Sequence, residues 1–123
     1  DTKIVTVVNF PLANNTIDVI QYQTQKALEL GADEVDTVLN ISALKNKDYK
    51  KVTSDIKLTK EVCKNNNLKV ILETDLLTKE EIEFIIMRTD DDILICDPEN
   101  EYSNIISYNC NYKYSSLFWI LCL

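Results

Sequence analysis

The 123-residue sequence predicts an α/β fold in which parallel strands alternate with helices. Four short apolar runs have the length and the β-branched composition of buried strands. Three stretches with helical spacing of apolar residues separate these runs. Strands that alternate with helices pair in parallel through right-handed crossovers. The order β-α-β-α-β-α-β is therefore expected.

The four predicted strands are spread along the first 96 residues. Each contains Val, Ile or Leu at most of its positions, and each is four to seven residues long, near the usual strand length. The runs cover residues 4–10, 35–41, 68–73 and 93–96.

The three predicted helices span residues 16–30, 48–64 and 79–88. Asn15 or Thr16 is a suitable N-cap for the first helix, and Gly31 stands where a glycine commonly ends a helix. Thr78 and Glu81 have the spacing of a capping box at the start of the third helix.

The composition excludes several classes of function. The formal net charge is −7, whereas nucleic-acid binding needs a basic face, so no nucleic-acid partner is expected. The sequence contains no histidine, which removes His-based nucleophilic triads and most zinc and haem sites. No metal and no cofactor are therefore expected.

The spacing of the four cysteines favours a cytoplasmic protein. No two cysteines have CxxC spacing, and free thiols in a reducing cytosol are the simplest interpretation. Cys96, without a histidine partner, is expected to be a buried core thiol and not a nucleophile. The apolar residues 117–123 are too few to span a bilayer, so no membrane association is expected.

Two architectures fit this order, an open doubly wound sheet and part of a (β/α)₈ barrel. The faces to which alternate side chains of each strand point distinguish between them. Side chains alternate between faces, so Asp36 lies on the opposite face from Val35, and Lys69 on the opposite face from Leu68. If the strands align, Asp36 and Lys69 are lateral neighbours. A sheet covered by helices on both faces should not carry such charges. Their presence favours an incomplete TIM barrel with both groups inside, either as an active site or as a buried structural pair.

Three short motifs stand in order along the chain: TVVNFP at residues 6–11, GADEVD at residues 31–36 and LKVILET at residues 68–74. Their order and spacing resemble those of the deoxyribose-phosphate aldolases. The segments ALKNKDY and LLTKEEI, at residues 43–49 and 76–82, are also similar to that family. The resemblance covers about residues 3–83, and several motifs in register make it specific.

The resemblance implies a class I aldolase that works without metal. The family cleaves the sugar phosphate 2-deoxy-D-ribose 5-phosphate into acetaldehyde and glyceraldehyde 3-phosphate through a lysine Schiff base. Asp36 matches the family's proton-carrying acid, and Lys69 matches a lysine of the same network. Asn9 and Glu73, on the same face by parity, are expected to bind substrate. Glu73 could equally act as an acid or base, or support Lys69 by an ion pair.

The sequence departs from the family where the Schiff-base lysine is expected. The family carries that lysine on the next strand, in a segment like ADF-(I/V)-KTSTG. By strand pattern Ile95 takes its place, whereas counting without a gap reaches Pro98, and neither can form an imine. Lys113, the only lysine after Lys79, lies in a segment unlike the family.

We therefore expect a partial aldolase barrel at residues 1–96 and an unmatched tail at residues 97–123. A complete barrel of this kind needs about 250 residues. The chain is expected to be inactive alone because the imine-forming lysine and the second half of the barrel are missing. Three alternatives remain open. They are a non-catalytic half-barrel that binds or assembles, possibly as a homo-oligomer, a degenerate or mistranslated gene product, and an unrelated open α/β domain.

Overall fold

The computed structural model describes residues 2–96, and the predicted tail at residues 97–123 lies outside the described residues. Strands and helices alternate as predicted, with a short helix inserted after the second strand and a 3-10 turn after the third. The elements in order are β1 (Val5–Val8), α1 (Ile17–Glu29), β2 (Glu34–Val38), α2 (Ile41–Lys45), α3 (Tyr49–Cys63), β3 (Asn67–Ile71), η1 (Thr74–Leu76), α4 (Lys79–Arg88) and β4 (Leu94–Cys96).

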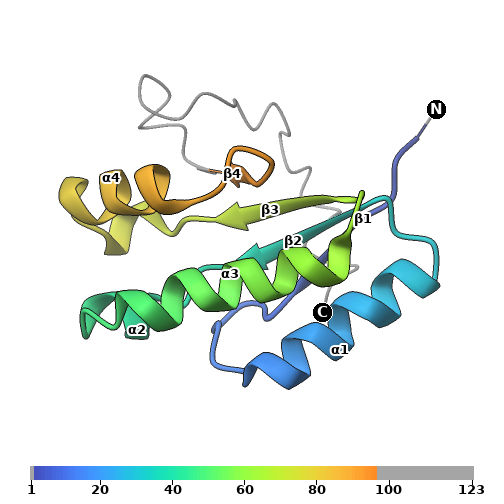
Figure 1. The fold of residues 1–123 in the computed structure, drawn as a ribbon, viewed down its shortest axis with the longest axis horizontal. Coiled ribbons are helices and arrows are strands. Elements are labelled where there is room, and N and C mark those ends of the chain that lie inside the picture. Colours follow the sequence, from blue (N-terminus) through green and yellow to red (C-terminus); the bar gives the residue numbers. More distant parts are fainter. Residues whose placement is uncertain (1, 97–123) are drawn as a thin grey trace.

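The four strands form one parallel sheet in the order β1-β2-β3-β4 (Figure 1). Sequential strands are thus spatial neighbours, which is the arrangement of a barrel wall and not of a doubly wound sheet that reverses its order. The register places Val7 opposite Asp36 and Asp36 opposite Lys69. This confirms that Asp36 and Lys69 are lateral neighbours.

One face of the sheet carries the helices. The helices α1 and α3 run side by side (Figure 1), and α1, α3 and α4 all contribute to a single apolar core. The strand residues in this core come from all four strands, at alternate positions where a strand contributes more than one, as side-chain alternation requires. They are Val8, Val35, Leu68, Val70 and Ile95.

The opposite face has a different composition. Its apolar cluster joins Val38 and Ile71 to Ala13, with Val7 and Phe10 packed against them, and it includes no residue of α1, α3 or α4. Within residues 2–96 the long helices therefore cover one face only. A doubly wound sheet needs helices on both faces, so the chain is an α/β segment with the construction of a barrel wall.

The structure corrects the predicted end of the second strand. Residues 35–41 were expected to be a single strand, but β2 ends at Val38 and Ile41 begins α2. The Asn40 side chain accepts a hydrogen bond from the Ala43 backbone N–H at 2.9 Å. Such a cap satisfies a helical donor and turns the chain out of the strand.

The predicted helix ends are largely confirmed. Gly31 follows α1 with φ of 101°, a left-handed conformation that costs glycine least. Thr16 is the N-cap of α1, but its side chain makes no capping hydrogen bond. Thr78 and Glu81 form the expected capping box on α4. The hydrogen bond from Lys45, together with the Thr78 backbone N–H, holds the pKa of the Glu81 carboxyl below its usual value.

We predict that Thr78→Ala lowers the free energy of unfolding by about 1 kcal/mol, because the Glu81 backbone N–H loses its hydroxyl acceptor. Urea denaturation followed by circular dichroism measures the change. Ser54→Ala, on the exposed side of α3, is the control and should not destabilise the chain. Equal stability of Thr78→Ala and the unmodified chain would contradict this role of the capping box.

Candidate active site

Asp36 lies at the centre of β2 on the face away from the helices. Its side chain is fully buried, with 0% of its surface exposed. Its register partner Lys69 is 5% exposed, and the Lys69 Nζ atom is 3.9 Å from Asp36 Oδ1. An ionised carboxylate at this depth requires an opposite charge nearby. The predicted pairing of these two groups is confirmed.

A second carboxylate, Glu34, pairs with the same amine. Its Oε1 atom is in ion-pair contact with Lys69 Nζ, and Glu34 is the nearer of the two acids. The residue is only 4% exposed, and its Oε2 atom accepts a hydrogen bond of 3.3 Å from the Asn67 side-chain amide. The buried charged cluster therefore consists of Glu34, Asp36 and Lys69, and we refer to these three residues as the buried triad.

Glu34 was not among the predicted site residues. The predicted strand began at Val35, which left Glu34 in the preceding turn. Extending the strand by one residue would have placed Glu34 two positions before Asp36, on the same face. The two-residue spacing between Glu34 and Asp36 was therefore the feature of the sequence that could have identified Glu34.

Apolar side chains surround the buried triad on neighbouring strands. Val5 is the register partner of Glu34, Val7 of Asp36 and Leu94 of Lys69. Charge interactions are stronger in such surroundings than in water. A buried amine beside two carboxylates can hold a proton and pass it between defined atoms, which is the chemistry of a general acid–base site.

Asn9 lies past the C-terminal end of β1, with φ of 54°. Its backbone N–H donates to Gln23 Oε1 at 3.0 Å, and its side-chain Oδ1 accepts from the Asn15 backbone N–H at 3.1 Å. These bonds fix the turn that leads into α1. Asn9 is buried at the edge of the sheet where a barrel places its active site, but its side-chain carbonyl is already used within the chain.

Glu73 lies two residues past the C-terminal end of β3 and is half-buried. The ion pairs of Lys69 within residues 2–96 run to Glu34 and Asp36. Glu73 and Asn9 follow strands that are separated by β2, so their backbones stand about 10 Å apart across the sheet. The structure thus brings Asp36 and Lys69 together, while Asn9 and Glu73 lie apart at the C-terminal edge.

The position assigned to the imine lysine requires a correction. Ile95 was expected to take that place in the interior, but its register partner is Val70 and it belongs to the core under the helices. The positions of β4 that share the face of Lys69 are Leu94 and Cys96. Ile95 therefore lies on the opposite face from Lys69, because neighbouring positions of a strand point to opposite faces.

Neither of the two cysteines within residues 2–96 provides a nucleophile. Burial raises the pKa of the Cys63 thiol to about 11, so little thiolate exists at neutral pH. Cys96 is disulfide-bonded, so the prediction of a free thiol is wrong for this residue.

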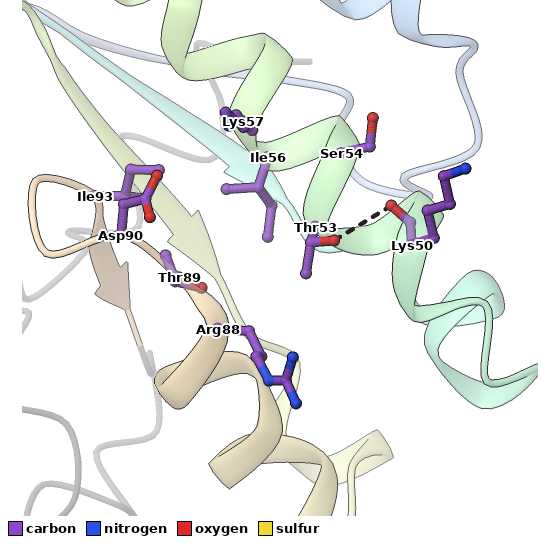
Figure 2. Close-up of a pocket in the computed structure, with 9 residues that line it drawn as sticks. All are labelled: Lys50, Thr53, Ser54, Ile56, Lys57, Arg88, Thr89, Asp90 and Ile93. Carbon is purple, nitrogen blue, oxygen red and sulfur yellow. Dashed lines mark hydrogen bonds between the residues drawn. The ribbon is translucent and has the colours of Figure 1, made fainter.

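A surface pocket of about 350 Å³ lies between α3 and α4, on the helical side (Figure 2). Lys50, Lys57 and Arg88 give it a basic rim, but the Lys50 side chain points away from it (Figure 2). The hydroxyls of Thr53 and Thr89 donate to carbonyls of their own helices. The pocket therefore offers few converging donors, and the buried triad is the stronger candidate site.

Residues 2–96 contain neither a metal-binding cluster nor a membrane-spanning helix. In the described part of the chain, no group of three or more His, Cys, Asp or Glu side chains is placed to hold a metal ion. None of the helices between residues 2 and 96 has the length and apolarity needed to cross a membrane.

A sequence model described as "DeoC/LacD family aldolase" matches residues 2–94. The chain belongs to this aldolase family. The deoxyribose-phosphate aldolase of Metamycoplasma arthritidis is 50% identical over 82 residues, which are 67% of this chain and 38% of the relative. That of Exiguobacterium sp. is 49% identical over 83 residues, with 68% and 38% covered. The chain thus spans about 38% of the length of these relatives.

Solved aldolase structures share the fold. A putative deoxyribose-phosphate aldolase from Coccidioides immitis superposes with a TM-score of 0.73 at 29% identity, over 76% of this chain and 38% of that one. The deoxyribose-phosphate aldolase from Aeropyrum pernix, described as tetrameric, superposes with a TM-score of 0.61 at 30% identity. The match covers 77% of this chain and 41% of that one. The fold is that of a partial TIM-barrel aldolase, as the strand parity predicted.

We predict that Lys69→Met lowers the free energy of unfolding of this aldolase-family chain by about 3–5 kcal/mol, because two buried carboxylates lose their counter-charge. Lys51→Met is the matched control. It removes an exposed pair with Asp55 and should cost about 0.5 kcal/mol or less. Urea denaturation of both variants gives the comparison, and similar losses in the two would show that the triad is not a buried ionic cluster.

A second comparison tests the face assignment of β4. Ile95→Lys should destabilise the chain by about 3 kcal/mol or more, because it places an unpaired ammonium in the core under the helices. Leu94→Lys should cost less, although its register partner is Lys69, because Leu94 is only half-buried and lies outside the core under the helices. If Leu94→Lys is the more damaging substitution in thermal denaturation, the register of β4 is incorrect.

Proposed function

We propose that this chain carries the acid–lysine part of a deoxyribose-phosphate aldolase site. In this proposal Asp36 transfers protons and Lys69 supports it electrostatically during cleavage of 2-deoxy-D-ribose 5-phosphate. The supporting observation is the pairing of Asp36 with Lys69, both buried, on the face of the sheet that no long helix of residues 2–96 covers. Family membership supplies the reaction class.

The remaining site roles belong to the same proposal. Asn9 and Glu73 would contact the sugar phosphate at the C-terminal edge of the sheet, where barrel enzymes bind substrate. A cytoplasmic location and a role in deoxyribonucleotide catabolism follow from the resemblance alone.

We further propose that this chain does not form the Schiff base. Lys69 is the only lysine on a strand of the described residues, and its amine is paired with two carboxylates. A protonated amine held in this way has no free electron pair with which to attack a carbonyl. The positions that share its face on β4 are Leu94 and Cys96, neither of which can supply an imine.

Borohydride trapping tests this proposal. The chain is incubated with 2-deoxy-D-ribose 5-phosphate and sodium borohydride, and mass spectrometry then measures the intact mass. We expect no reduced adduct, because no lysine of the described strands is available as a nucleophile. The Metamycoplasma arthritidis relative, treated identically, is the positive control. An adduct mapped to any lysine of this chain would show that it performs the imine step.

A further inference from the structure

The Lys69 amine does not lie closest to the acid opposite it in the sheet. Its register partner is Asp36, yet its closer ion pair is with Glu34, whose own register partner is Asn67. The Lys69 side chain therefore reaches diagonally, toward the N-terminal ends of the strands.

Glu34 is itself held in place from the neighbouring strand. The Asn67 side-chain amide donates to Glu34 Oε2 at 3.3 Å, while Oε1 faces the Lys69 amine. Both contacts come from β3, and Glu34 is 4% exposed. The Asn67 amide thus holds one oxygen of the carboxylate, and the other oxygen can bind an ammonium group in a fixed position.

Glu34 holds the Lys69 ammonium on the side of Asp36 that is nearer the N-terminal ends of the strands. Active sites of barrel enzymes lie at the C-terminal ends of the strands. Two residues of a strand span about 6.6 Å, so Glu34 lies about that much deeper than Asp36. Glu34 therefore draws the Lys69 ammonium away from the end at which substrate would enter.

We propose that Glu34 is a positioning residue that holds the Lys69 ammonium below Asp36 and prevents it from closing onto the Asp36 carboxylate. At 3.9 Å the amine still supplies a favourable charge to Asp36, but it lies beyond ordinary hydrogen-bond length. This inference rests on the proposed function, because it assigns Asp36 the proton-transfer role and gives Lys69 and Glu34 supporting roles.

The arrangement implies a specific response to substitution. In Glu34→Gln the amide keeps the shape of the side chain and loses its charge, so Asp36 becomes the only carboxylate of the triad. The Lys69 ammonium should then move onto Asp36. Glu34→Asp keeps the charge but is one methylene shorter, so it should also release the amine. A role that depended on charge alone would leave Glu34→Asp like the unmodified chain.

Nuclear magnetic resonance of the whole chain, with labelled lysine and without substrate, tests the proposal. In the unmodified chain, we expect nuclear Overhauser contacts from the Lys69 Hε protons to the Hγ protons of Glu34. In Glu34→Gln and Glu34→Asp, contacts to the Asp36 Hβ protons should replace them, with a shift of the Lys69 ¹⁵Nζ resonance. Glu29→Gln, which removes a surface pair with Lys26, is the control and should leave the Lys69 signals unchanged.

Two results would overturn the proposal. One is contact of Lys69 with Asp36 in preference to Glu34 in the unmodified chain, which decides the matter even if the variants fail to fold. The other is an unchanged Lys69 resonance in both folded Glu34 variants. Neither result depends on imine formation, so failure here is separate from failure of the borohydride experiment.

Discussion

The burial of one amine between two carboxylates is the interaction on which the rest of this structure depends. Glu34, Asp36 and Lys69 are each at least 95% buried on adjacent parallel strands. Removing these charges from water is unfavourable by several kcal/mol for each ion, and only close pairing offsets that cost. The strand register is consequently tied to the electrostatics, because a slip of one residue would turn Lys69 to the opposite face.

The one-sided packing of the helices makes this arrangement possible. Apolar residues of β2, β3 and β4 meet α1, α3 and α4 on one face, so the charged positions between them must point the other way. In a closed barrel that second face is the interior, where a polar cluster can also serve as a reaction site. The same alternation that builds the core therefore positions the candidate site.

The features that depend on the alternation of side chains along a strand could be predicted from the sequence. The pairing of Asp36 with Lys69 was predictable because both residues lie near the centres of short strands that align in parallel. Glu34 was missed because it is the first residue of β2, and strand ends are the least certain positions in a sequence. The face of Ile95 was misjudged because β4 has only three residues, too few for a clear pattern of alternation. The bonds of Asn9 to Gln23 and Asn15 could not be predicted, since they depend on a local turn with positive φ.

A double-mutant cycle between Glu34 and Lys69 measures the central interaction most directly. The free energies of unfolding of the unmodified chain, Glu34→Gln, Lys69→Met and the double variant give the coupling energy of the pair. Direct ionic contact in a buried setting predicts a favourable coupling of about 1–3 kcal/mol. Additive effects, within about 0.3 kcal/mol, would mean that the two side chains do not interact and that the buried triad does not exist in solution.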